Sequence, residues 1–246
     1  MMYTLEEILD ERNRQLYNDL EAKAAIILGE SDDECWGEKY KDDVLYISCA
    51  KTAYPVACFT HELLHGKYDL AGMEMPMFQV EAIGHKAVEA LEDKARNLMS
   101  YAYNQIMHHK LFPDFVALGF PAGEFLHEAD AADGLCQVAK DIATLKARWK
   151  REFPYGVPAS LIVWPFLYLR SPHDTGTGAQ TLLKEIRNMS GTAYYALQGL
   201  LTKFLADSSP NVSQYIARLF YLCDLPNVGF GRAKSKLTWA RDCTHE

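Results

Sequence analysis

Apolar residues recur along this chain with the period of an α-helix over most of its length. Residues 4–28 are predicted to form a helix, because their apolar side chains would face one way and the charged ones the other. Thr4 followed by Glu7 matches a capping box at the start of this helix. The helices that the same periodicity predicts farther along the chain span residues 53–67, 81–110, 127–150, 179–205 and 211–223.

The helical pattern is interrupted at a few places. Residues 44–49 combine β-branched and aromatic side chains and predict a short strand, which follows a polar loop over residues 30–43. Pro113 predicts a break before a short helix that ends near Gly119. The stretch 159–169 is apolar on all sides and predicts a buried segment. Together these patterns predict an α+β protein that is predominantly α-helical, with one small β element.

Composition narrows the possible classes of protein. Hydrophobic residues make up 49% of the 246 residues, which is enough for a sizeable core, and the formal net charge of −8 argues against a nucleic-acid partner. The N-terminus lacks a signal peptide and no apolar run is long enough to span a bilayer, so we expect a cytoplasmic protein with no membrane partner. The scattered cysteines, without a CxxC motif, indicate neither disulfides nor a cysteine-ligated zinc site. No feature of the sequence indicates an oligomeric state.

The most informative motif is His61-Glu62-Leu63-Leu64-His65, which lies inside the helix predicted over residues 53–67. Residues four apart lie on the same face of a helix, so the two imidazoles can bind one tetrahedral Zn²⁺. Glu62 lies beside them, where a carboxylate can take a proton from an attacking water. A catalytic site of this type needs a third protein ligand. One known arrangement places a histidine ten residues after the first, but that position is Ala71.

The helix predicted over residues 81–110 is the expected source of the third ligand. Its polar residues form one stripe, at steps of three or four positions: Glu89, Asp93, Asn97, Tyr101, Asn104 and His108. Two ligand assignments compete. Glu89 with Asp93 resembles the ExxxD pairing of thermolysin-like enzymes, whereas His108, with Asn104 one turn before it, would complete a three-histidine site. Glu89 and His108 are about 28 Å apart on a straight helix, so both cannot bind one ion.

Three segments together resemble a group of poorly characterised bacterial HExxH proteins. The segments are Phe59-Thr-His-Glu-Leu-Leu-His-Gly66, Asn104-Gln-Ile-Met-His108 and Phe112-Pro-Asp-Phe-Val-Ala-Leu-Gly-Phe120. In that group a helix after the motif carries Asn-x-x-x-His or Asn-x-x-x-Asp, before a segment ending in Leu-Gly-Phe or Leu-Gly-Tyr. More broadly the chain resembles zincin metallopeptidases, including the ImmA/IrrE type, in which a glutamate on the second helix is usual. The specific resemblance covers about residues 44–120.

The resemblance implies a set of ligands and a domain organisation. The zinc ligands that it implies are His61, His65 and His108. It also implies that Glu62 is the general base and that Asn104 supports the third ligand. We therefore expect a zincin-like catalytic core over residues 1–120 and an added helical part over residues 121–246.

We expect a zinc-dependent hydrolase, and most simply an intracellular peptidase that acts on a peptide or protein substrate. The oxyanion needs a hydrogen-bond donor besides zinc, for which the candidates are Tyr68, Tyr101, His109 and His127. His109 points about 100° away from His108, toward substrate or solvent. The strand at 44–49 offers an edge for an extended peptide. Two alternatives stay open: a zinc hydrolase of another amide or ester, and a catalytically inactive zincin-like binding or regulatory protein.

Overall fold

The computed structural model describes the chain in eight stretches, which are residues 3–31, 35–81, 85–126, 128–172, 178–208, 210–225, 228–231 and 237–243. The side chains of residues 85–91 and 128–133 lie outside this description. The protein is α+β and mostly helical, as the sequence predicts. It divides into two compact units. The first unit comprises Met1–Glu74, Met107–Ala131 and Pro172–Asp174, and the second comprises Met75–Ile106, Ala132–Ser171 and Thr175–Glu246.

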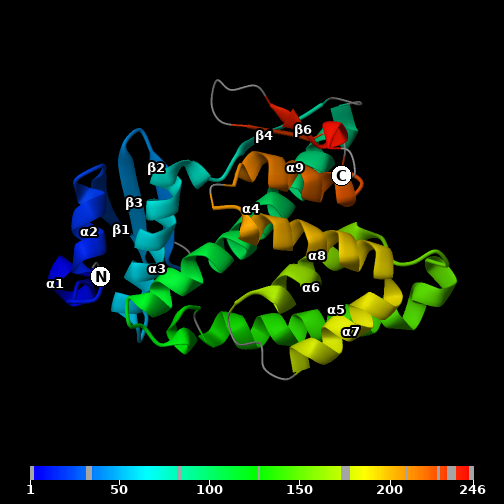
Figure 1. Ribbon diagram of the computed structural model, residues 1–246, viewed down its shortest axis with the longest axis horizontal. Helices are drawn as coiled ribbons and strands as arrows, with labels where there is room; N and C mark the ends of the chain where they lie inside the picture. The colour runs from blue at the N-terminus through cyan, green and yellow to red at the C-terminus, as the bar shows by residue number, and fades with distance from the viewer. Residues whose placement is uncertain are drawn as a thin grey trace. The chain divides into compact units, whose positions relative to one another are not determined.

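The first unit is built on a three-stranded sheet with helices packed on one face (Figure 1). Its strands are β1 (Ala25–Glu30), β2 (Gly37–Lys41) and β3 (Val44–Cys49), in the order β1-β3-β2. Its first three helices are α1 (Leu5–Ile8), α2 (Arg14–Glu21) and α3 (Pro55–Tyr68). Their apolar faces share one core with the inner face of β3, formed by Ile8, Tyr17, Leu20, Leu45, Ile47, Cys49, Phe59 and Leu63.

Two predictions for the N-terminal region are wrong. The helix predicted over residues 4–28 ends at Glu21 and is interrupted after Ile8, while Ala25–Glu30 forms β1. Pairing of β1 with β3, parallel and in register along its whole length, overrides the helical periodicity of its side chains. The segment predicted as a polar loop, residues 30–43, contains β2.

β3 is the central strand of its sheet, because it is hydrogen-bonded to β1 on one side and to β2 on the other. The expectation that an extended peptide pairs with the edge of residues 44–49 is therefore wrong. β2 and β3 form a hairpin whose two-residue turn, Asp42 and Asp43, has φ angles of 52° and 60°. Two left-handed residues in succession give the turn whose twist matches that of the flanking strands.

The strand and the helix predicted around the motif are confirmed as β3 and α3. Pro55 occupies the first turn of α3, where a missing N–H costs nothing. Gly66 allows α3 to lie close against the sheet, since a Cβ at this position would come within 2.5 Å of Leu45 Cδ2. After Tyr68 the chain continues into a π-helical turn, Asp69–Met73, in which Gly72 has a φ of 86°.

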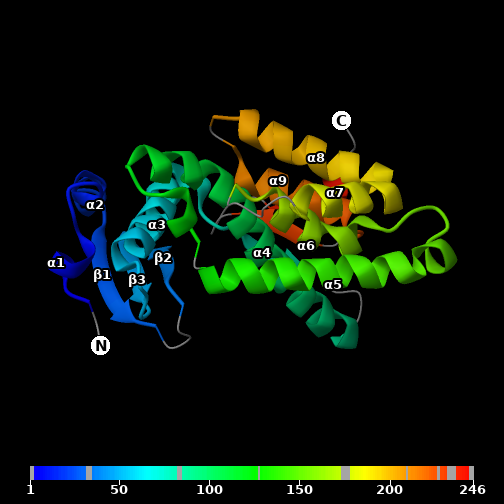
Figure 2. The ribbon, with the colours of Figure 1, turned by 90° about the horizontal axis from the view of Figure 1, so that it is seen from below.

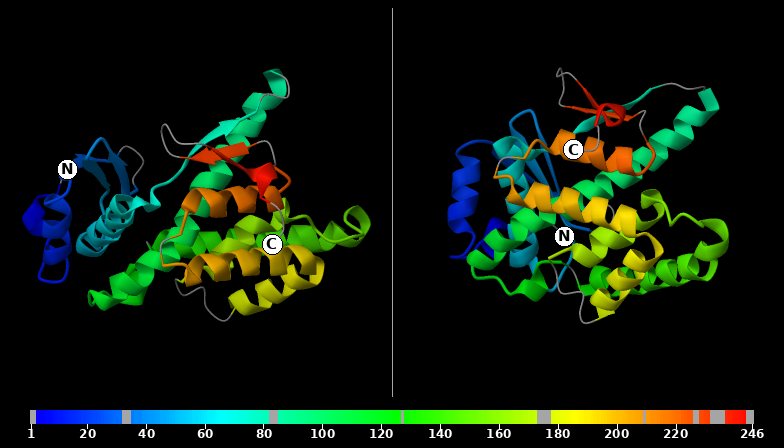
Figure 3. Two further views of the ribbon diagram at one scale, coloured as in Figure 1. Left: turned by 45° about the horizontal axis from the view of Figure 1, so that its top comes forward. Right: turned by 45° about the vertical axis from the view of Figure 1, so that its right-hand side comes forward.

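The second unit combines helices with a small antiparallel sheet. The sheet consists of β4 (Met77–Val80), β5 (Val228–Gly231) and β6 (Thr238–Trp239), and lies against α9 (Val212–Leu222) (Figure 3). The other helices that begin and end after residue 127 are α5 (Glu128–Glu152), α6 (Ala159–Arg170), α7 (Gly178–Met189) and α8 (Gly191–Ala206). α6 packs against α7 and α8, and α8 packs against α9 (Figure 2). None of the helices within the described stretches is long and apolar enough to cross a membrane.

The division into units differs from the expected boundary at residue 120. Because β4 pairs with β5, the stretch that follows residue 74 belongs to the same compact unit as the C-terminal part of the chain. The C-terminal predictions were otherwise close: α5 and α9 match the helices expected there, whereas the helix predicted over residues 179–205 is two helices divided at Ser190.

A single helix, α4 (His85–Ala117), contributes residues to both units and continues through Pro113, so the break predicted there is wrong. Leu111 and Phe115, on either side of the proline, are fully buried in the first unit and hold the helix in place. The helix ends through Gly119, which has a φ of 90°, and the N–H of Phe120 donates to the carbonyl of Phe115.

We expect Gly66→Ala to lower the free energy of unfolding by about 1–3 kcal/mol, because the added methyl group would press on Leu45, which is fully buried. Urea denaturation followed by circular dichroism measures this change. Gly199→Ala in α8 is the matched control, because a Cβ there meets nothing within 4 Å. It should stabilise the protein by about 0.5–1 kcal/mol. Similar effects of the two substitutions would contradict the close approach of α3 to β3.

Candidate metal centre

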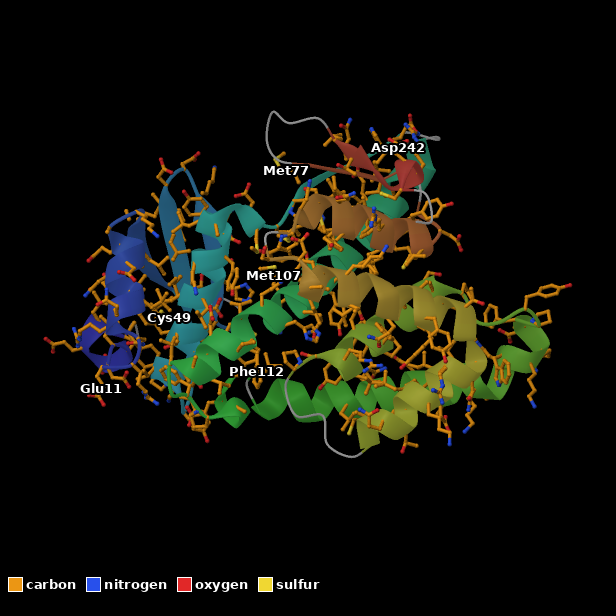
Figure 4. All side chains as sticks on the ribbon, viewed as in Figure 1. Glu11, Cys49, Met77, Met107, Phe112 and Asp242 are labelled. Atoms are coloured by element: carbon orange, nitrogen blue, oxygen red, sulfur yellow. The ribbon has the colours of Figure 1, made fainter. Side chains whose placement is uncertain are left out.

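Three histidines of the first unit gather at one point. His61 and His65 lie one turn apart on α3, and His108 lies on the stretch of α4 that Met107 and Phe112 mark in Figure 4. Their ligand nitrogens all lie within 4.8 Å of one another. Within the described stretches of the chain, no other group of three or more His, Cys, Asp or Glu side chains comes this close together.

The geometry of the three imidazoles fits a metal ion. The Nε2 atoms of His61 and His65 are 3.2 Å apart. Two nitrogens bound to one tetrahedral zinc at 2.0–2.1 Å are about 3.3 Å apart, which agrees with this spacing. The ring of His108 meets both other rings edge-on, with centroid distances of 4.9 Å to His61 and 5.6 Å to His65. All three side chains are buried, so the group can hold an ion away from bulk solvent.

The protonation states of the buried groups also favour ligation by imidazole. Burial, together with the neighbouring His61, holds the pKa of His65 well below its usual range, which keeps the ring in the neutral form that binds metals. Cys49 and Cys58 lie near Glu62 but are buried, and burial is the main cause that raises their pKa values to about 11 and about 12. Both thiols therefore stay protonated at neutral pH and are poor ligands.

An aromatic residue that the sequence did not single out covers two of the imidazoles. The ring centroid of Phe125 is 4.6 Å from that of His61 and 5.2 Å from that of His108. Phe125 follows a short 3₁₀ helix, Ala122–Glu124, and is held in turn by Phe112 and Phe115, at 5.1 Å and 5.2 Å. These contacts restrict the orientation of the imidazoles and exclude water from one side of them. No periodic pattern marks Phe125, because it lies in an irregular connection.

Tyr68 ties the two histidine-bearing helices together. Its hydroxyl lies 3.0 Å from the carbonyl oxygen of Lys110 and 3.2 Å from Oδ2 of Asp114, both on α4. Asp114 also forms an ion pair of 2.5 Å with Lys67 on α3. This set of contacts accounts for the Tyr68 hydroxyl without a substrate, in contrast to its predicted role as a donor to the oxyanion.

The other predicted residues lie in different surroundings. Asn104, expected to support the third ligand, has an exposed side chain, and His109 is half-buried. Tyr101 belongs to the second unit, where its ring stacks on Trp164 at 5.2 Å. Two further candidates, His127 and the side chain of Glu89, lie outside the described residues. Asp93, the partner expected for Glu89, is exposed.

Glu62 is buried beside the histidines. Its side chain is 7% exposed, and its carboxyl group forms no hydrogen bond or ion pair with any described residue. Burial raises the pKa of Glu62 to about 8. A second carboxyl group, that of Glu38 on β2, lies nearby, and its pKa is raised to about 9 by burial, by Asp69 and by Glu62. Sequence reasoning missed Glu38 because its strand was predicted as a loop.

The candidate centre thus combines three buried imidazoles with a carboxyl group beside them. These residue types can hold a divalent ion, and the carboxyl group can accept and release a proton next to it. Comparison of the chain with known protein families, with curated proteins and with solved structures gave no match.

We expect the protein to bind one Zn²⁺ per chain and His108→Ala to weaken this binding at least about 100-fold, because one of three ligands is lost. Competition with a chromogenic chelator measures the affinity. His109→Ala is the matched control, since it removes the adjacent imidazole, which is not one of the three. Loss of zinc on Glu89→Ala, with retention on His108→Ala, would instead identify Glu89 as the third ligand.

Glu38→Gln is expected to stabilise the metal-free protein, and more strongly at higher pH. The pKa of Glu38 is raised from 4.5 to about 9 on folding, so between these values the folded protein keeps a proton that the unfolded chain releases. The stability of the wild type therefore falls through this window, by up to about 1.4 kcal/mol per pH unit for this group, whereas glutamine does not titrate.

Thermal melting of both proteins at pH 5, 7 and 9 measures this difference. Glu11→Gln removes an exposed carboxylate from the same unit and should leave the pH dependence unchanged. A difference in Tm between Glu38→Gln and the wild type that stays constant from pH 5 to pH 9 would show that the pKa of Glu38 is not raised.

Proposed function

We propose that this protein is a zinc-dependent metallohydrolase with a zincin-like core, and more specifically a peptidase. The ligands in this proposal are His61, His65 and His108, and the general base is Glu62. The observation that carries the proposal is the convergence of three buried imidazoles beside a buried carboxyl group that has no ion-pair partner among the described residues. Three protein ligands with a fourth position left for water are typical of catalytic zinc, whereas structural zinc sites have four protein ligands.

Glu62 is placed to move a proton in the reaction. When bound, zinc would lower the pKa of a coordinated water and polarise the scissile carbonyl. Glu62, whose pKa burial raises to about 8, would ionise more readily beside a cation and so be ready to accept a proton. It would take this proton from the attacking water and return it to the leaving amine. Phe125 would shield the imidazoles from water on one side, which strengthens electrostatic interactions inside the site.

Two features favour catalysis over a purely structural or regulatory metal site. A carboxyl group that is buried without a partner costs stability and is of most use where it has a chemical task. In addition, the ligand nitrogens come from two helices that contacts of Tyr68 and Asp114 hold together, so the ligand geometry is set by the fold before a metal binds.

The test is Glu62→Gln in the zinc-loaded protein. This substitution keeps the shape of the side chain but removes the base, so we expect hydrolysis to fall by about 10²–10⁴-fold while one zinc per chain is retained. Digestion of a proteome-derived peptide mixture, with mass spectrometry of the new termini, measures cleavage across many peptide sequences at once. Glu11→Gln, an exposed glutamate of the same unit, is the control. Cleavage by Glu62→Gln at the wild-type rate, or no cleavage by the zinc-loaded wild type, would contradict the proposal.

A further inference from the structure

β1 is an edge strand that carries no protection against pairing with another strand. It is hydrogen-bonded to β3 on one side, and within the described stretches no strand pairs with its other side (Figure 2). Its first five residues, Ala25–Gly29, are all apolar or glycine, and Ile27 is 47% exposed. An exposed apolar edge strand that lacks Lys and Pro readily pairs with a strand of another chain.

The opposite edge of the same sheet, β2, carries the protection that β1 lacks. Lys39 and Lys41 are exposed on its outer face. Glu38 pairs with the buried Ile47 and so places a carboxyl group on the inner face. Lysines and inward-pointing charges on an edge strand prevent it from pairing with other chains. The sheet is therefore closed to association at β2 and open to it at β1.

The backbone of β1 presents unpaired hydrogen-bonding groups along its open side. The N–H of Ala25 donates to the carbonyl of Asp43, and the parallel pairing with β3 repeats this direction at every second residue of β1. The N–H and C=O groups of Ile26 and Leu28 therefore point away from β3, and no described residue bonds to them. Such groups are satisfied either by water or by a further strand.

The sequence of β1 is suited to antiparallel pairing with itself. Directly opposed residues of an antiparallel pair share a face of the sheet, so two β1 strands can be centred with Ile27 opposite Ile27. Ile26 then lies opposite Leu28, and the outward-pointing N–H and C=O groups of these two residues bond to each other. Ala25 lies opposite Gly29, so small residues also meet.

Charges at the two ends of β1 favour the same register. With Ile27 opposite Ile27, Glu30 of one copy lies opposite Ala24 of the other and beside its Lys23. Both charged side chains are exposed, and opposite charges that meet across two strands are stabilising. The register shifted by one pair, with Leu28 opposite Leu28, would instead place Glu30 opposite an isoleucine.

We propose that the protein forms a homodimer in which the β1 strands of two copies pair antiparallel, centred on Ile27, and join their three-stranded sheets into one. The contact is the same on both copies, because a two-fold axis relates them. Pairing uses both β1 edges and leaves the charged β2 edges outermost, so association ends at the dimer. The proposal is independent of the proposed hydrolase function.

Sedimentation velocity of the full chain at increasing concentrations should show a monomer–dimer equilibrium. Ile27→Lys places like charges opposite each other at the two-fold axis and should raise the dissociation constant at least about tenfold. Tyr46→Lys is the matched control, because Tyr46 pairs with Ile27 on the same face and is 43% exposed but lies on the central strand. It should change the dissociation constant less than about threefold.

A wild type that stays monomeric at all concentrations would overturn the proposal, as would an Ile27→Lys variant that dimerises like the wild type. Equal loss of the dimer in Ile27→Lys and Tyr46→Lys would place the contact on the face of the sheet and not on its edge, which also overturns it.

Amide hydrogen exchange, measured by NMR on the wild type, tests the edge pairing without any substitution. The amides of Ile26 and Leu28 should exchange at least about tenfold more slowly once the dimer forms. Those of Ile27 and Gly29 are already bonded to β3 and should change much less. Protection that does not alternate along β1 would contradict the proposed pairing.

A disulfide cross-link tests the register. Opposed residues that are not hydrogen-bonded to each other in an antiparallel pair have Cα atoms about 4.5 Å apart, which a disulfide can bridge. Ile27→Cys should therefore give a covalent dimer on oxidation, in a background where the exposed Cys35 and Cys136 are replaced by serine. Tyr46→Cys in the same background should not. A dimer that Ile27→Cys fails to cross-link would overturn the pairing centred on Ile27.

Discussion

The fixed contact between the end of α3 and the last turns of α4 is the constraint on which the centre depends. Tyr68 lies three residues after His65, and Lys110, whose carbonyl accepts from the Tyr68 hydroxyl, lies two residues after His108. His65 and His108 are thus each less than one helical turn from the contact that ties their helices together, and His61 lies one further turn along α3. This contact fixes the two helices close to the histidines, and Phe125 packs on the rings of His61 and His108, so the three nitrogens converge.

The first unit contains two kinds of ionisable side chain, imidazole and carboxyl, whose pKa values favour the neutral form when no cation is bound. Burial keeps His65 deprotonated, and burial with neighbouring acids keeps Glu38 protonated. Water would satisfy all of these groups better than the protein interior does, so their burial lowers the stability of the fold. A protein keeps such groups most readily where they have a function, which in the proposed hydrolase is to hold a metal ion and to move a proton beside it.

Much of this fold follows from local sequence patterns, and the failures have a common cause. β3, α3, α5 and α9 were predicted because each combines a periodic apolar face with suitable residues at its ends. β1 and β2 were missed because they are edge strands, whose half-exposed side chains are set by pairing with β3 rather than by a local period. The Asp42-Asp43 pair was the available signal for the hairpin. α4 continues through Pro113 because the burial of Leu111 and Phe115 outweighs the lost hydrogen bond.

Part of the candidate site could likewise be predicted from neighbouring residues in the sequence, and the rest depends on tertiary packing. His61, Glu62 and His65 could be assigned from five consecutive residues, since one helical turn fixes their relation. Helical periodicity left both His108 and Glu89 as candidates, and a family resemblance decided for His108, which the fold brings to the other two histidines. Phe125 and Glu38 reach the centre through tertiary packing and carry no local signal. Since one helix carries His61, Glu62 and His65, its geometry alone fixes the carboxyl group beside two imidazoles, whereas the place of His108 depends on the contact between α3 and α4.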